Sequence, residues 1–86
     1  HIQYFIDCVG ENSNLLKSSS AIQSFLLAGN AKAKEGARLL QAKGFDVRPI
    51  LSPTVSKGTE RLRIILHSFN TKFEIQSLAD SLHALS

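Results

Sequence analysis

Residues 61–67, with the sequence RLRIILH, are the stretch that decides the fold. Leu62, Ile64 and Leu66 recur at every second position, and successive side chains of a β-strand point to opposite faces. The alternation therefore predicts a strand with one apolar face directed at the core. The residues of its other face are Arg61, Arg63, Ile65 and His67.

The preceding stretch, residues 45–51 (FDVRPIL), also alternates apolar and polar side chains and predicts a second strand. Pro49 lacks the backbone N–H that a central strand needs, so we expect this strand at a sheet edge or a bulge. Residues 52–60 (SPTVSKGTE) join the two strands, which we expect to pair as a hairpin with a long loop. The alternating residues are Phe45, Val47 and Leu51 on one side and Asp46 and Arg48 on the other.

A further strand and a helix precede this hairpin. Residues 22–28 (IQSFLLA) are a short apolar run that ends at Gly29 and predicts a strand. Residues 31–43 are rich in Ala, Lys, Leu and Gln, which are strong helix formers. We expect Asn30 to be the N-cap of this helix and Gly44 to supply its left-handed C-terminal cap.

Amphipathic patterns predict a helix at each end of the chain. Residues 1–9 (HIQYFIDCV) repeat apolar residues at helical spacing. Near the other end, Thr71 and Glu74 form a capping box in front of a second amphipathic segment. The apolar stripe of that segment consists of Ile75, Leu78, Leu82 and Leu85.

The predicted order is helix, strand, helix, strand, strand, helix. It indicates an α+β fold in which helices cover one face of a small three-stranded antiparallel sheet. A length of 86 residues, with 43% hydrophobic and 20% charged residues, predicts one globular domain spanning residues 1–86. No apolar run approaches the ~20 residues of a membrane-spanning helix. Because the chain starts with His1 and contains no Met, we expect a piece of a longer protein.

Several kinds of site receive little support from the composition. The net charge of +3 is spread along the chain, so no nucleic-acid-binding tail is predicted. The single cysteine, Cys8, cannot form an internal disulfide and favours a reducing, cytoplasmic setting. Residues 18–20 are three serines without a nucleophile motif. The histidines lack metal-ligand spacing; they are His1, His67 and His83.

The strongest chemical signal is the pair of arginines on the last predicted strand. Arg61 and Arg63 would project from one face, about 6.6 Å apart along the strand. A guanidinium held by a strand is suited to bidentate binding of a carboxylate. The alternative is two solvated arginines on an open sheet face, which could pair with Asp46 or Glu60. Ile65 on the same face indicates that another domain covers part of it.

The loop at 52–60 is a weaker candidate for an anion site. Its hydroxyls and backbone amides could bind an anion, but the glycine pattern of a phosphate-binding loop is absent. An ordinary hairpin connection is the competing interpretation. The residues alone therefore predict a small α+β domain with an arginine-bearing sheet face.

Residues 44–71, GFDVRPILSPTVSKGTERLRIILHSFNT, resemble the C-terminal domain of the 8-amino-7-oxononanoate synthases. Those enzymes are α-oxoamine synthases, which depend on pyridoxal phosphate and have fold type I. The combination of PTV, KGT and RLR carries the resemblance. With IQSFLLAGN and the final helix, it extends over roughly residues 20–85.

The resemblance implies a parent acyltransferase of biotin biosynthesis, in which L-alanine condenses with a pimeloyl thioester and CO2 is lost. It implies that Arg63 binds the amino-acid carboxylate and that Thr54 lines the substrate site. An anchored carboxylate fixes which bond at the α carbon stands perpendicular to the cofactor ring, which acts as the electron sink.

The resemblance also implies what this chain does not contain. Pyridoxal phosphate and its Schiff-base lysine would belong to a large domain outside the chain, so no catalytic or cofactor-binding residue is expected in residues 1–86. The implied partners are the two substrates, that large domain and a second subunit of a homodimer, with neither nucleic acid nor membrane.

The sequence departs from the family pattern at three places. Ser56 stands where the family usually has proline, which puts the position of Thr54 in doubt. Ile65 and Asn70 replace a small polar residue and a histidine, and His67 has the wrong offset for that histidine's role. Two alternatives stay open: another α-oxoamine synthase of the 2-amino-3-ketobutyrate ligase type, and a free-standing module that binds an anion or RNA.

Overall fold

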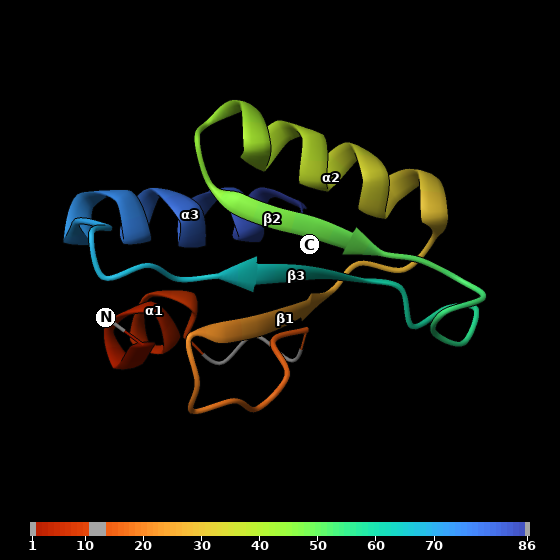
Figure 1. Cartoon of the computed structure of the whole chain (residues 1–86), viewed down its shortest axis with the longest axis horizontal. Helices are drawn as coiled ribbons and strands as arrows, with labels where there is room; N and C mark the ends of the chain where they lie inside the picture. The colour runs from red at the N-terminus through yellow and green to blue at the C-terminus, as the bar shows by residue number, and fades with distance from the viewer. Residues whose placement is uncertain (1, 11–13, 86) are drawn as a thin grey trace.

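The computed structural model describes residues 2–10 and 14–85 and contains the three predicted strands. The strands are β1 (Ile22–Leu26), β2 (Asp46–Ile50) and β3 (Arg61–Ile65), and they form an antiparallel sheet in the order β1-β3-β2 (Figure 1). The edge position predicted for Pro49 is confirmed, because β2 pairs only with β3 within the sheet. The last strand of the chain therefore lies in the middle of the sheet, where neighbours on both sides hold it.

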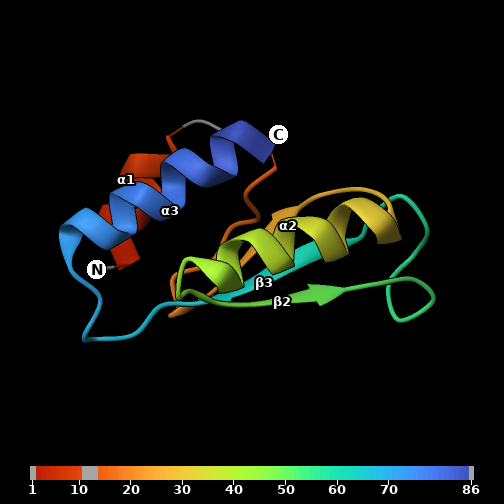
Figure 2. The same ribbon diagram turned by 90° about the horizontal axis from the view of Figure 1, so that it is seen from above.

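Three helices complete the fold and cover one face of the sheet (Figure 2). They are α1 (Ile2–Val9), α2 (Asn30–Ala42) and α3 (Lys72–Leu85). α2 packs on β2 and β3, and α1 packs against α3. The predicted α+β fold and its element order are confirmed. No helix within residues 2–10 and 14–85 is long and apolar enough to cross a membrane.

The face of the sheet below the helices forms the core, as the alternation in β3 predicted. Leu62 and Ile64 of β3 are at most 1% exposed, and so are Phe25 of β1 and Val47 of β2. The helices contribute the other side of this core with the buried residues Phe5, Val9, Ala33, Ala37, Leu40, Ile75, Leu78, Ala79 and Leu82.

The start of α2 differs from the prediction for Asn30. The N-cap is Gly29, whose backbone has φ +99°, a conformation that glycine adopts without strain. Asn30 is the first helical residue, and its side-chain oxygen accepts a hydrogen bond from the Ser52 N–H at 3.0 Å. The capping prediction was wrong because this amide serves a contact 22 residues away rather than the first turn of its own helix.

The start of α3 and the end of α2 follow the local sequence. The capping box before α3 is confirmed: the Thr71 N–H donates to Glu74 Oε1 at 2.8 Å, and the Glu74 N–H donates to Thr71 Oγ1 at 3.1 Å. Gly44 has φ +91° directly after α2, as predicted. His83 of α3 hydrogen-bonds the Val9 carbonyl through Nε2 at 2.8 Å and so ties α3 to the end of α1.

The segment before β1 covers the free edge of that strand. The Leu16 N–H donates to the Ser24 carbonyl at 2.9 Å, and the Leu26 N–H donates to the Asn14 carbonyl at 2.7 Å. Gln23, which is fully buried, donates from Nε2 to the Ser20 carbonyl at 2.7 Å. These contacts reduce the exposed backbone of β1, and an unpaired strand edge is a common route to aggregation.

Candidate functional site

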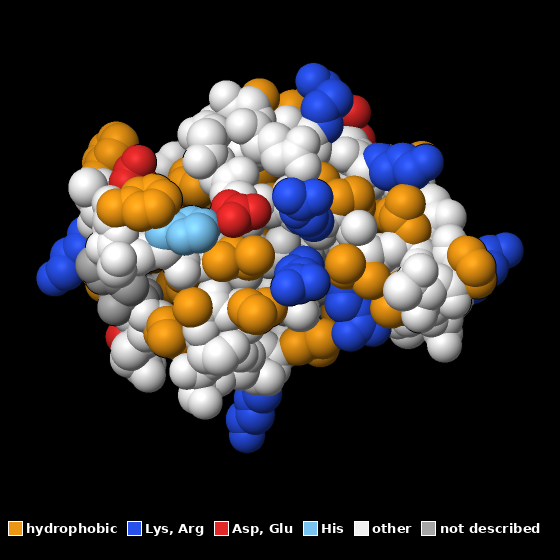
Figure 3. Space-filling view, viewed as in Figure 1, with side chains coloured by type: hydrophobic (Ala, Val, Ile, Leu, Met, Phe, Trp, Pro, Cys, Tyr) orange, Lys and Arg blue, Asp and Glu red, His pale blue; other side chains and the backbone are white. Residues whose placement is uncertain are grey.

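The uncovered side of the sheet carries the arginines that the sequence singled out. We call it the arginine face and define it by the outward residues of the three strands, which the register aligns in three rows. The rows are Ile22, Ile65 and Asp46; Ser24, Arg63 and Arg48; and Leu26, Arg61 and Ile50. Figure 3 shows basic side chains near the middle of this face, with an acidic side chain and a histidine beside them and hydrophobic side chains between.

Arg63 occupies the centre of the arginine face. It lies in the middle strand, between Ser24 of β1 and Arg48 of β2, and its side chain is exposed. Residues 62 and 64, on either side of it in the chain, are anchored in the core. A strand held in this way keeps the start of the arginine side chain in place, so little backbone freedom is lost when a ligand binds.

The two acidic residues proposed as partners of the arginines are engaged elsewhere. Asp46 Oδ2 lies 2.9 Å from His67 Nε2. Glu60 is 2% exposed, and its Oε1 accepts hydrogen bonds from the N–H groups of Gly29 and Gly58, each at 2.9 Å. Within the described residues, neither Arg61 nor Arg63 forms an ion pair, so the suggested pairing with Asp46 or Glu60 is not found, while solvated arginines stay an open interpretation.

Glu60 instead organises the loop that enters β3. The backbone N–H of Gly29 is the main cause that holds the pKa of Glu60 below its ordinary value, with further contributions from the N–H groups of Glu60 and Gly58 and the hydroxyl of Ser52. Burial acts in the opposite direction but is outweighed. An ionised carboxylate thus ties the loop to the start of α2, directly before the strand that bears Arg63.

Thr54 lies in the turn that follows β2 and is exposed. The loop around it is ordered by the Asn30 contact to Ser52 and by a hydrogen bond from Thr59 Oγ1 to the Ser56 carbonyl at 2.6 Å. Thr54 follows the end of β2 at Ile50 by four residues. No hydrogen bond joins it to Arg63 among the residues that the structure describes, so the two predicted site residues are not in direct contact.

The sequence analysis missed a cluster at the other end of the arginine face. His67 hydrogen-bonds Asp46, and its ring stacks on Phe69 with centroids 4.8 Å apart and an interplanar angle of 10°. The Asn70 side chain accepts a hydrogen bond from the His67 N–H at 2.8 Å. The register of β2 and β3 was the signal that could have found this cluster, because Asp46 lies opposite Ile65, two residues before His67.

The lysines and the potential metal ligands of the described residues are scattered over the surface or isolated from one another. A Schiff-base lysine needs a sheltered position beside a phosphate-binding site, whereas each lysine here is exposed. Residues 2–10 and 14–85 contain no group of three or more potential metal ligands, and His1 lies outside them. The exposed lysines are Lys17, Lys32, Lys34, Lys43, Lys57 and Lys72.

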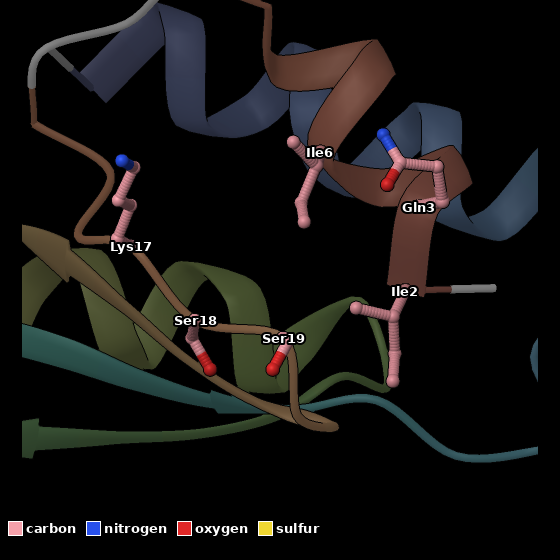
Figure 4. Close-up of a pocket in the computed structure, with 6 residues that line it drawn as sticks. All are labelled: Ile2, Gln3, Ile6, Lys17, Ser18 and Ser19. Carbon is pink, nitrogen blue, oxygen red and sulfur yellow. The ribbon is translucent and has the colours of Figure 1, made fainter.

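A hollow of about 720 Å³ lies between α1 and the segment before β1. Figure 4 shows Ile2 and Ile6 projecting into it from α1, with Lys17, Ser18 and Ser19 on the opposite side. The Ser18 hydroxyl donates to the Ile22 carbonyl at 2.8 Å, so it serves the backbone rather than a catalytic base.

No family model matches the chain, but curated relatives do. The chain is 37% identical to the 8-amino-7-oxononanoate synthase of Methylobacillus flagellatus over 78 residues, which are 91% of this chain and 20% of that protein. The enzyme of the same name from Delftia acidovorans is 38% identical over 72 residues, 84% of this chain and 18% of that protein. The Buchnera aphidicola enzyme is 35% identical over 86 residues, 99% of this chain and 22% of that protein.

The chain thus spans about a fifth of the length of these relatives. The match extends over most of the described structure and includes the hairpin on which Arg48 and Arg63 lie opposite one another. The chain is therefore homologous to one segment of the 8-amino-7-oxononanoate synthases, as its PTV, KGT and RLR motifs predicted.

Proposed function

We propose that residues 1–86 are the C-terminal small domain of a pyridoxal-phosphate-dependent acyltransferase that forms 8-amino-7-oxononanoate from L-alanine and a pimeloyl thioester. The observation that carries the proposal is Arg63: an exposed guanidinium at the centre of an open sheet face, without a carboxylate partner in the described residues. The similarity to enzymes of that name supplies the reaction class.

In this proposal Arg63 binds the carboxylate of the amino acid. Its planar fork of N–H donors matches the two carboxylate oxygens, and such charge-assisted hydrogen bonds are stronger than neutral ones. The anchored carboxylate orients the α carbon for reaction, while the chain's own core keeps the strand rigid. Because the carboxylate leaves later as CO2, Arg63 must bind it without favouring the ground state too strongly.

Thr54 has a supporting role in the same proposal. It belongs to the loop that joins β2 to β3, so it enters the site from the end of the arginine face. Its exposed hydroxyl can donate to or accept from a substrate that lies across that face. The loop that contains Thr54 is held by the hydrogen bonds from the Gly29 N–H to Glu60 and from the Ser52 N–H to Asn30.

The cofactor and its lysine are assigned to the part of the parent enzyme outside this chain. Pyridoxal phosphate would supply the electron sink for chemistry at the α carbon. A homodimeric parent and a cytoplasmic location stay predictions from the resemblance. The identity of the thioester carrier is likewise open, as is the alternative of another α-oxoamine synthase.

The proposal is tested by Arg63→Gln in the full-length enzyme. We expect the KM for L-alanine to rise at least tenfold, consistent with losing a charged contact of about 2–3 kcal/mol. Arg38→Gln removes the same charge from α2, where Arg38 pairs with Glu35, and should leave alanine kinetics unchanged. Unchanged kinetics in Arg63→Gln would remove this residue from the site.

The uncompensated arginines also keep the RNA-binding module as a second candidate. Aromatic residues normally supply stacking platforms on such surfaces, but none lies in the three rows of the arginine face. Phe69 stacks on His67 beyond the last row. Retention on a nucleic-acid column that falls steeply with salt would favour this candidate, and no retention at low salt would exclude it.

A further inference from the structure

The middle row of the arginine face holds a second guanidinium. Arg48 of β2 lies directly opposite Arg63 of β3, and residues so paired in an antiparallel sheet have Cα atoms about 5 Å apart. Both side chains are exposed and emerge from the same face. We propose that Arg48 and Arg63 bind one carboxylate together, with Ser24 as a third donor in the row. This inference rests on the proposed function and extends it to a residue that the sequence analysis left unassigned.

The first argument is electrostatic. Like charges directly opposite each other in a sheet are destabilising. Within residues 2–10 and 14–85 neither arginine forms an ion pair with a carboxylate: Asp46 of the adjacent row contacts His67, and Glu60 accepts hydrogen bonds from Gly29 and Gly58. A bound anion would place a negative charge between the two guanidinia and relieve it.

The remaining described carboxylates are also committed or remote from this row. Glu35 pairs with Arg38 on α2, Glu74 caps α3, and Asp7 accepts a hydrogen bond from Gln3 at 2.8 Å. Asp80 lies on α3, in the helical layer that covers the other side of the sheet. The counter-charge for Arg48 and Arg63 is therefore expected from a ligand rather than from this part of the chain.

The second argument concerns the shape of the ligand. The donor row is flanked by Ile22, Ile65 and Asp46 on one side and by Leu26, Arg61 and Ile50 on the other, so most of its neighbours are aliphatic. A compact anion with a short aliphatic body fits such a stripe, since its charge meets the arginines and its carbon atoms meet the isoleucines and leucines. The chemical class is thus an aliphatic carboxylate.

The third argument is the number of donors. A carboxylate has two oxygens with about four acceptor sites, and one guanidinium fork fills two of them. A second guanidinium and a hydroxyl can fill the others. Ser24 of β1 lies on one side of Arg63 and Arg48 of β2 lies on the other. The row therefore presents donors from both sides of Arg63. In this arrangement Arg63 anchors the carboxylate and Arg48 strengthens the hold.

The test uses the full-length protein with its cofactor bound. Propionate, which is alanine without its amino group, is titrated calorimetrically at fixed ionic strength. The wild type should bind propionate, and Arg48→Gln and Arg63→Gln should each weaken binding about tenfold. Arg48→Lys should recover part of the affinity, and Arg38→Gln should match the wild type. Melting temperatures of the variants establish that each one is folded.

Kinetics with L-alanine complete the test and separate the two proposals. If both arginines hold one carboxylate, Arg48→Gln raises KM with little change in kcat, and the double variant loses less than the product of the single losses. An effect of Arg63 alone on both propionate and alanine would overturn the shared site but leave the proposed function intact. Propionate binding that depends on both arginines, without turnover of alanine, would support the site and contradict the reaction.

Discussion

The two faces of β3 have different roles, although their residues alternate along only five positions of the chain. Leu62 and Ile64 are at most 1% exposed and form the centre of the core. Arg63 lies between them in sequence and is exposed on the other side of the sheet. One short strand thus stabilises the domain with one face and presents a charged group with the other. Substitutions one residue apart should therefore have effects on different properties.

The largest effect on stability is expected from Leu62→Ala on the covered face. Leu62 is fully buried below the helices, so the variant loses apolar contacts and leaves a cavity. We expect the free energy of unfolding to fall by about 2–5 kcal/mol. Urea unfolding followed by circular dichroism measures the change. A loss below about 1 kcal/mol would mean that β3 is not the centre of the core.

A smaller effect is expected at acid pH through Glu60. Its pKa is lowered in the folded state, so its contribution to stability is fully present above the unfolded pKa of about 4.3. That contribution is lost as the pH falls through the lower pKa of the folded state. Glu60→Gln should therefore weaken the dependence of stability on pH below about 4.3. Parallel pH profiles for the wild type and this variant would show that folding does not lower the pKa of Glu60.

The smallest effect is expected from Arg48→Gln on the arginine face. Removing one of two facing like charges should raise the free energy of unfolding by about 0.2–1 kcal/mol in the absence of ligand. Arg38→Gln loses its pair with Glu35 instead and should lower stability slightly. If Arg48→Gln raises the free energy of unfolding and Arg38→Gln lowers it, the arginine face carries a charge repulsion that the surface of α2 does not. A loss of stability in Arg48→Gln would show that this arginine has a structural partner.

Much of the fold was accessible from local patterns. The alternation in residues 61–67 predicted which side chains of β3 face the core, and Pro49 predicted an edge strand. The Thr71–Glu74 capping box predicted the start of α3. These predictions succeed because each depends on the preferences of residues a few positions apart.

The predictions that failed concern groups whose partners are distant in sequence. Asn30 has the right side chain for an N-cap but contacts Ser52, and Glu60 lies beside Arg61 yet turns to the Gly29 N–H. The pair of Asp46 and His67 also needs the register of β2 against β3. Short polar side chains have several possible partners, and the packing of loops and strands selects one.

The sequence by itself determined the strand periodicity, the helix limits at Gly44 and Thr71, and the motifs that relate this chain to the 8-amino-7-oxononanoate synthases. The tertiary structure alone decided that Arg48 lies opposite Arg63 and that neither forms an ion pair with a described carboxylate. The physical reason is the distance along the chain between the groups that interact. Periodicity and capping are governed by neighbours along the chain, whereas an unbalanced charge on a sheet face depends on register and on where each distant carboxylate finds its hydrogen bonds.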